Sequence, residues 1–248
     1  MRPEAAYRLY LRLKFGTGHP AARPQLPLPN GVLKNRAEWQ QAFEQAKAAK
    51  LPLHRGDEKN WDHLAAVYAI LGATTPSARV LDAGAEFYSN VLPALFAYGY
   101  RDLYGINLSF TEEARRGPIR YQHGDITQTV FADNFFDAVA CMSVIEHGVP
   151  LDGYFREMYR VLKPGGLLIT STDYYPTAID TRGKMAHGAA IKVFTRGEIQ
   201  EILRLAQEVG FESTGKVDLE CSERPVRWEQ FDLDYSFVIF TLRKPVDR

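Results

Sequence analysis

Short apolar segments alternate with helical segments over most of the chain, and this alternation limits the fold more than any other feature. Apolar runs at 78–82, 102–107 and 136–142 predict strands, and a helix over about 89–98, closed by Gly99, connects the first two. Alternating strands and helices build a parallel sheet, because each helical crossover returns the chain to the same edge. The pattern therefore predicts an α/β fold with a doubly wound, mostly parallel sheet and helices on both faces.

The alternation continues toward the C-terminus with two more helices and another strand. An apolar stripe predicts a helix over 151–162, and Lys163-Pro-Gly-Gly166 ends it before a strand over 167–172. Thr195, followed three residues later by Glu, makes a capping box for the next helix, and Gly210 ends that helix. Each of these segments extends the same layered domain.

The end of the chain breaks this pattern. Two strands, expected at about 211–218 and 235–243, follow each other without a helix, so we expect them to pair antiparallel. The chain has 248 residues, of which 46% are hydrophobic, and it can bury a core large enough for one domain with an extension. We expect an N-terminal arm, linker and lead-in helix over 1–60, and the sheet domain over 61–248.

The N-terminal extension consists of short segments of different character. Residues 7–15 fit a strand by partial alternation or a helix by an apolar stripe, and the pattern does not decide between them. Residues 19–31 contain four prolines, so they are expected to be extended and to stay out of any central strand. Capping signals predict one helix over about 35–50 and a second over about 60–72.

Charge and composition exclude several classes of protein. The formal net charge is zero, which disfavours wrapping of nucleic acid by charge alone, although residues 1–60 are basic. A solvated arm explains that basic segment more simply than a polyanion-binding arm. Cys141 and Cys221 fit neither a zinc knuckle nor a redox pair, and we expect both to be reduced. The apolar stretches are too short for a bilayer span and the first residues lack a signal-peptide core, so a cytoplasmic protein without membrane contact is expected.

The segment Arg79-Val-Leu-Asp-Ala-Gly-Ala-Glu86 joins the first predicted strand to its helix. An apolar run that ends in Asp-x-Gly before a helix is how nucleotide-binding α/β domains present backbone N–H groups to a ligand. With Phe135-Phe-Asp137 and Arg160-Val-Leu-Lys-Pro-Gly-Gly166, it makes the chain resemble class I S-adenosylmethionine-dependent methyltransferases, best over residues 78–172. The resemblance implies a Rossmann-like, seven-stranded sheet with an antiparallel last strand, an N-terminal helical extension, and S-adenosylmethionine as cofactor.

The resemblance also implies which residues bind the cofactor. Asn107 stands where the family has an acidic residue that holds both ribose hydroxyls, and an amide can still hold a diol. Capping of the following turn is the other role open to this residue. By resemblance, Asp125 accepts from the adenine amino group, Ile126 packs on the ring, and Ser143 lies under the methionine portion. The full implied set is Asp82, Gly84, Ala85, Glu86, Asn107, Leu108, Asp125, Ile126 and Ser143.

Two positions depart from the family's pattern Asp/Glu-x-Gly-x-Gly-x-Gly. Glu86 and Tyr88 replace the second and third glycines, so part of the close backbone approach that glycine permits is lost. A carboxylate at residue 86 would repel the methionine carboxylate of the cofactor, but it would accept hydrogen bonds from the α-ammonium group. We therefore expect a variant loop that still binds the cofactor.

The candidate general base is His147, which follows the strand predicted over 136–142. A sulfonium already carries an activated methyl group, so the protein needs mainly to align the acceptor, and a base helps only when the acceptor is protonated. A neutral imidazole accepts a proton near pH 7, although a capping or packing role for His147 is equally open. Residues 173–194, which include His187, have the length of a lid or acceptor-binding loop, and a structural loop is the alternative.

These residues predict an S-adenosylmethionine-dependent methyltransferase that acts on a small molecule, a sugar or secondary metabolite, with oxygen as the acceptor atom. One alternative is an RNA methyltransferase that uses the basic residues 1–60. Another is a non-catalytic binding module of the same fold, suggested by Glu86, Tyr88 and Asn107. The sequence contains no P-loop, Gly-x-Ser-x-Gly elbow or His-Glu-x-x-His helix, so NTP hydrolysis, serine-hydrolase chemistry and a zinc site have no support.

Overall fold

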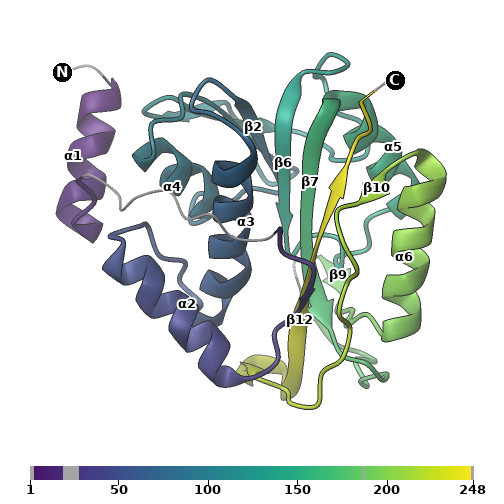
Figure 1. The fold of residues 1–248 in the computed structure, drawn as a ribbon. Helices are drawn as coiled ribbons and strands as arrows, with labels where there is room; N and C mark the ends of the chain where they lie inside the picture. The colour runs from purple at the N-terminus through teal and green to yellow at the C-terminus, as the bar shows by residue number, and fades with distance from the viewer. Residues whose placement is uncertain (1–2, 19–27, 187, 247–248) are drawn as a thin grey trace.

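The computed structural model describes residues 3–18, 28–186 and 188–246, and a sheet lies between two groups of helices (Figure 1). Within these residues the sheet has ten strands: β1 (Gly31–Val32), β2 (Arg79–Ala83), β3 (Asp102–Asn107), β4 (Ala114–Arg116), β5 (Ile119–His123), β6 (Phe136–Met142), β7 (Leu162–Tyr174), β10 (Glu212–Ser213), β11 (Val226–Trp228) and β12 (Leu233–Arg243). The helices are α1 (Pro3–Phe15), α2 (Arg36–Ala48), α3 (Asn60–Ala73), α4 (Val91–Ala97), α5 (Leu151–Val161) and α6 (Arg196–Val209). Short 3-10 turns, η1 (Asp57–Lys59) and η2 (Glu229–Phe231), and a small hairpin of β8 (Met185–Ala186) and β9 (Ala189–Ala190) complete the described elements.

The sheet confirms the predicted α/β architecture. Its order is β1-β12-β7-β6-β2-β3-β5-β4, in which β7, β6, β2, β3 and β5 are parallel neighbours and β12 is antiparallel to β7. Six of the described strands match the expected ranges, and β5, with five residues, is a further parallel strand for which no range was predicted. The additional strands β1, β4 and β11 have two or three residues each, which is too short for a periodic sequence signal.

The strand expected at 211–218 forms only over the two residues of β10. Continued pairing along β12 would bring the chain opposite the positions that β1 occupies, since Gly31 pairs with Ile239 and Val32 with Val238. Asn30 holds this junction, because its Oδ1 accepts from the backbone N of Thr241 at 2.9 Å. The proline-rich linker thus leads into an edge strand, while residues 19–27 of it lie outside the described residues.

The transition from α5 to β7 is tighter than the sequence predicts. The segment Lys163-Pro-Gly-Gly166 was expected to separate helix and strand, but β7 begins at Leu162, directly after the helix. The register with β6 shifts between Phe136 and Ala138, and the backbone N of Gly165 bonds to the carbonyl of Lys244. The Pro-Gly-Gly segment is therefore an irregular first part of the strand.

The starts of α2 and α6 follow the capping signals, whereas α3 begins at Asn60 without a side-chain cap. Asn35 accepts from the backbone N of Glu38 at the start of α2, and a capping box at Thr195 begins α6. Gly210 ends α6 with φ +117°, a conformation that L side chains avoid. The open alternative for residues 7–15 is resolved as helix α1, in which Tyr7 and Leu11 are buried on one face.

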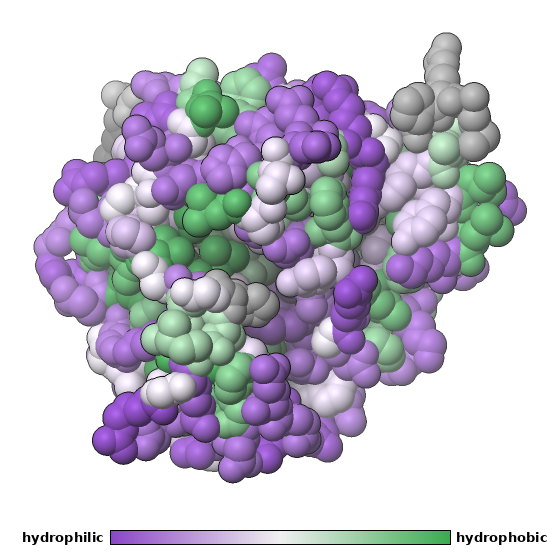
Figure 2. All heavy atoms as spheres, turned by 180° about the vertical axis from the view of Figure 1, so that it is seen from behind, coloured by the Kyte–Doolittle hydropathy of each residue, from purple (hydrophilic) through white to green (hydrophobic). Residues whose placement is uncertain are grey.

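Two apolar cores hold the layers together. Helices α3 and α4 pack their buried side chains on one face of the sheet, and α5 and α6 pack on the other. The opposite view (Figure 2) shows a surface that is mostly hydrophilic, with hydrophobic residues in patches between. Among the described residues, no helix combines the length and apolar character that a membrane span requires. The division at residue 60 stays a prediction, and β1 on its N-terminal side is part of the sheet.

Candidate functional site

A cavity of about 850 Å³ opens at the edge of the sheet where β2, β3 and β6 end. The carboxyl ends of parallel strands meet at one edge, and open α/β sheets bind their ligands there. Turn η1 and strand β11 line the cavity from other sides. Eight residues that the sequence analysis singled out lie in its wall: Gly84, Glu86, Asn107, Leu108, Asp125, Ile126, Ser143 and His147.

Asp82 and Ala85 lie beneath the cavity and not in its wall. Both were expected to bind cofactor, and both are buried, at 3% and 0% exposure, because Asp82 still belongs to β2 and Ala85 turns into the core. One oxygen of Asp82, Oδ2, is buried without a hydrogen-bond partner among the described residues. Burial raises the pKa of this carboxyl to about 7. An unpartnered buried oxygen is costly, so a donor reaching it from a ligand or water would be stabilising.

The turn after β2 requires glycine at one position only. Gly84 has φ +96°, and a Cβ there would lie 2.3 Å from Cγ2 of Val144, so no other residue fits. Glu86 and Tyr88 are not among the described residues with positive φ. Replacement of the two other glycines of the family pattern therefore leaves the backbone of this loop unstrained.

The Glu86 carboxylate is turned toward the end of β3. Its Oε1 accepts from Oγ of Ser109 at 3.0 Å and from Nδ2 of Asn107 at 3.4 Å. Asn107 also donates to the carbonyl of Gly84 at 3.2 Å, and its Oδ1 accepts from the backbone N of Ser109 at 2.9 Å. Asn107 therefore caps the turn after β3, one of its two predicted roles, while it also lines the cavity.

The residues implied at the adenine come from the turn after β5. Oδ1 of Asp125 accepts from the backbone N and the hydroxyl of Thr127, at 2.8 and 2.7 Å. Ile126 is 7% exposed beside it, while Leu108 across the cavity mouth is 66% exposed. The turn thus offers a carboxylate edge next to an apolar side chain, which suits a flat ring with an exocyclic amino group.

A cluster of charged side chains lies on the other side of the cavity, below the end of β6. Lys59 Nζ donates to Oγ of Ser143 at 2.5 Å and contacts Oδ1 of Asp173 at 3.5 Å. Ser143 holds a left-handed backbone conformation, φ +53°, which is strained for a residue with a side chain. Glu146 is buried and accepts from the hydroxyl of Thr172 at 2.8 Å.

The protonation of this cluster is set by burial and by its mutual charges. Burial, and then the neighbouring Asp173, raise the pKa of Glu146 to about 8, so this carboxyl is largely neutral near pH 7. Burial alone would lower the pKa of Lys59, but the carboxylates of Asp173, Asp62 and Glu146 outweigh it, and the pKa is raised. Lys59 therefore remains a cation inside the protein.

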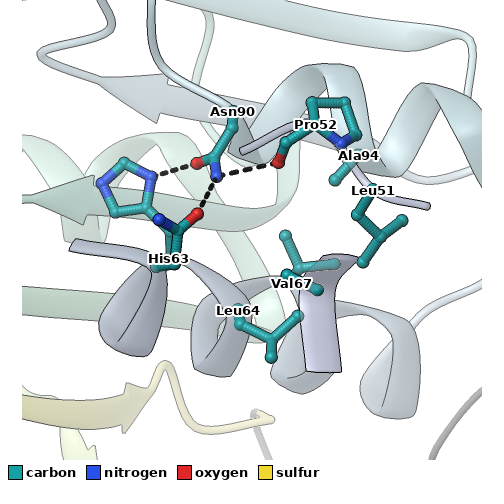
Figure 3. Close-up of a pocket in the computed structure, with 9 residues that line it drawn as sticks. Leu51, Pro52, His63, Leu64, Val67, Asn90 and Ala94 are labelled. Atoms are coloured by element: carbon teal, nitrogen blue, oxygen red, sulfur yellow. Dashed lines mark hydrogen bonds between the residues drawn. The ribbon is translucent and has the colours of Figure 1, made fainter. Parts of the chain in front are cut away.

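Two histidines that were not predicted as site residues lie against each other in the cavity wall, with their rings tilted by 52°. The rings of His54 and His63 are 4.9 Å apart, and Nδ1 of His63 bonds to Oδ1 of Asn90, whose amide donates to Pro52 (Figure 3). Burial lowers the pKa of both histidines to about 4, so both are neutral near pH 7. The void whose lining residues Figure 3 shows next to His63 has about 10 Å³, room for at most one water molecule.

The segment expected to form a lid contributes little to the cavity wall. Within the described part of 173–194, only Asp173 lines it. Tyr174 is buried and donates to the carbonyl of Leu219, and Tyr175 donates to Ser222, so both tyrosines serve the packing of the loop. His187 lies outside the described residues.

Lys59 and Glu146 were missed as site residues although sequence signals were present. Lys59 opens a Lys-Asn-Trp-Asp segment before the second lead-in helix, a place from which the chain can reach over a cofactor. Glu146 directly precedes His147 after β6. Their burial depends on long-range packing, which no local pattern records.

Comparison with known sequences matches part of the chain, including several residues of the cavity wall, to one sequence family. Residues 81–170 match the family described as "Methyltransferase domain". Sterol 24-C-methyltransferase erg-4 of Neurospora crassa is 31% identical over 118 residues, which cover 45% of this chain and 31% of that protein. The 24-methylenesterol C-methyltransferase 2 of Oryza sativa is 32% identical over 103 residues, 39% of this chain and 28% of that protein. The chain thus spans about a third of the length of the curated relatives it matches.

Solved structures share the fold at low sequence identity. A geranyl diphosphate methyltransferase in complex with SAM superposes with a TM-score of 0.58 at 14% identity, covering 87% of this chain and 98% of that one. The [4+2]-cyclase SpnF superposes with a TM-score of 0.55 at 22% identity, covering 98% of this chain and 96% of that one. Phosphoethanolamine N-methyltransferase 2 of Haemonchus contortus in complex with S-adenosyl-L-methionine superposes with a TM-score of 0.54 at 18% identity. The superposition covers 74% of this chain and 52% of that one.

Proposed function

We propose that this protein transfers a methyl group from S-adenosylmethionine to a small polar molecule, because residues 81–170 match the methyltransferase family and the fold is Rossmann-like. The observation that carries the proposal is the cavity at the ends of β2, β3 and β6, which the Gly84 turn opens. At about 850 Å³ it has room for a nucleoside cofactor together with a small acceptor.

The residues present fit the cofactor. The buried Oδ2 of Asp82 lacks a partner among the described residues directly under the turn where the cofactor would lie. Asp125 and Ile126 would hold the adenine, and Asn107 and its neighbours would hold the ribose. Ser143 would contact the methionine portion. When bound, the sulfonium supplies an activated methyl group, and the side chains have to orient the acceptor and exclude water.

The charged side of the cavity supports a polar acceptor. Lys59, Glu146 and Asp173 lie in the wall below the end of β6. An apolar ring system such as a sterol would desolvate these groups without replacing their hydrogen bonds, and that is costly. We infer a sugar or a hydroxylated secondary metabolite, with oxygen as the acceptor atom.

His147 is the proposed base for a protonated acceptor. It lines the cavity directly after the β6 end, next to Glu146, and its backbone N donates to the carbonyl of Val144 at 3.0 Å. The elevated pKa of Glu146 makes that carboxyl a proton donor near pH 7, and it complements an imidazole that accepts. We therefore assign proton removal to His147 and hydrogen bonding of the acceptor to Glu146.

Calorimetric titration with S-adenosylmethionine and S-adenosylhomocysteine tests the cofactor assignment. We expect dissociation constants in the micromolar range, and ATP at the same concentration serves as a nucleotide control that should not compete. Absence of binding by the folded protein would favour the binding-module alternative instead.

Product analysis by mass spectrometry tests the acceptor assignment. The protein is incubated with S-adenosylmethionine and either hydroxylated small molecules or a sterol, and S-adenosylhomocysteine release is followed. We expect release with polar acceptors, while turnover of the sterol would overturn the polar assignment. An RNA affinity that falls steeply with salt would support the RNA alternative.

A further inference from the structure

Glu86 bonds through its carboxylate to the end of β3, although this residue comes from the loop after β2. Oε1 of Glu86 accepts from Ser109 and from Asn107, and both donors follow or end β3. Among the described residues, these side-chain donors reach Oε1 only, and Oε2 of the same carboxylate accepts none. Glu86 is half-buried and lines the cavity, so this second oxygen belongs to a group available to a ligand.

The end of β3 is where a nucleoside's ribose is recognised in doubly wound sheets. In these folds an acidic residue after the second strand accepts from the ribose hydroxyls, because a vicinal diol presents two donors to one carboxylate. Here the strand ends in Asn107, whose Oδ1 already accepts from the backbone N of Ser109 at 2.9 Å. The amide alone therefore offers a diol less acceptor capacity and no negative charge.

The sheet order separates Glu86 from the methionine side of the cavity. Strand β2 lies between β3 and β6, and neighbouring strands are about 4.8 Å apart. Ser143, the residue assigned to the methionine portion, follows β6, whereas the Glu86 carboxylate is bonded to residues of the β3 end. This position removes the expected repulsion of the methionine carboxylate, and it also takes Glu86 away from the α-ammonium group that the sequence analysis gave it.

We propose that Glu86 binds the ribose hydroxyls of the nucleoside cofactor and replaces the carboxylate that the chain lacks at residue 107. Asn107 and Ser109 act as positioning residues, because their hydrogen bonds hold Oε1 and orient the carboxylate. The inference rests on the proposed cofactor and assigns to a loop residue a contact that the fold ordinarily takes from the strand end.

Binding of two nucleosides to Glu86→Gln separates the ribose role from the ammonium role. S-adenosylhomocysteine and 5′-methylthioadenosine share adenine and ribose, but only the first carries the amino acid portion. We expect Glu86→Gln to weaken both by the same factor, about tenfold, because a charge-assisted hydrogen bond is lost in each. Weakening of S-adenosylhomocysteine alone would assign Glu86 to the ammonium group, and unchanged affinity for both would also overturn the proposal.

A second measurement tests whether a carboxylate moved to residue 107 restores the binding of 5′-methylthioadenosine. The double variant Glu86→Gln/Asn107→Asp moves the charge to the strand end, and we expect it to regain most of the lost affinity for 5′-methylthioadenosine. A double variant that binds no better than Glu86→Gln, while melting at the same temperature, would contradict a ribose role.

Controls separate this inference from the proposed function. Glu113→Gln makes the same chemical change at an exposed residue away from the cavity and should bind like the unaltered protein. An analogue of 5′-methylthioadenosine without the ribose hydroxyls should not distinguish Glu86→Gln from the unaltered protein. If the unaltered protein binds neither nucleoside, the cofactor assignment itself fails, whereas normal binding with an indifferent Glu86→Gln removes the inference alone.

Discussion

Both sides of the cavity carry carboxylates, but those on the β3 side lie near solvent and those on the β6 side are buried. On the β3 side, Glu86 and Asp125 lie on surface turns and are held by hydroxyl and amide donors. On the β6 side, Glu146 and Asp173 are buried at 2% and 4% exposure around the cation of Lys59. Carboxylates near solvent can accept from a ligand at little cost, while buried ones need compensation within the protein. The comparison indicates that the β3 side of the cavity stays solvated, whereas the β6 side is kept dry.

Among the changes that test this difference between the two sides, removal of the Lys59 charge is expected to have the largest effect, and the effect is on stability. Lys59→Met leaves the buried Asp173 without its cation, and we expect a loss of about 3 kcal/mol in the free energy of unfolding. Chemical denaturation measures it, with Lys47→Met on exposed α2 as the control. A loss as small as that of the control would mean that the cluster does not depend on its cation.

Asp125→Ala should chiefly affect binding. We expect the dissociation constant of S-adenosylhomocysteine to rise about tenfold, since an acceptor for the adenine amino group is removed. Because Asp125 also holds Thr127, calorimetry on Thr127→Val should accompany it, and that variant should bind nearly normally. An unchanged constant for Asp125→Ala would move the adenine site elsewhere.

The pH dependence of the melting temperature should reveal the buried Glu146 carboxyl on the β6 side of the cavity. Folding raises the pKa of Glu146 from 4.5 to about 8, so the native state holds a proton that the unfolded chain releases. Glu146 therefore lowers stability progressively as pH rises from about 4.5 to about 8. Between pH 6 and 8.5 we expect the melting temperature of Glu146→Gln to fall several degrees less than that of the unaltered protein. Parallel pH curves for the two proteins would contradict the buried, protonated state.

Removal of residues 1–30 should have the smallest effect on binding. No described residue of this segment lines the cavity, and we expect the dissociation constant of the cofactor to stay within about twofold. Stability should fall, because Tyr7 stacks on Phe96 in the core and Asn30 holds Thr241. Calorimetry at a temperature where the shortened protein remains folded makes the measurement, and lost binding there would give the segment a direct role.

Local sequence signals predicted the elements better than the directions of the side chains. Asn35, Thr195 and Gly210 mark helix ends because capping is decided within four residues. The shortening of the strand at 211–218 depends on β1, which comes from the other end of the chain, and no local pattern contains that competition.

The candidate site shows the same limit. Eight of the residues predicted from the Asp-x-Gly turn and the strand ends line one cavity, and their roles toward a cofactor or acceptor stay predictions. Asp82 lies below the wall because it still belongs to β2, and Glu86 turns toward β3 because its carboxylate bonds to Asn107 and Ser109. Lys59 reaches Ser143 across 84 positions of sequence, a contact that only the folded chain creates.

The pairing of β12 also has a consequence for synthesis. Val32 of β1 pairs with Val238 of β12. At a ribosomal rate of about 5–20 residues per second, β12 is therefore synthesised roughly 10–40 s after β1. Until β12 emerges, the outer edge of β7 is an unpaired strand with buried-type side chains, the kind of edge that recruits other chains. The nascent protein should therefore depend on chaperones until its last strand is released, even though most of the cavity wall has been synthesised long before.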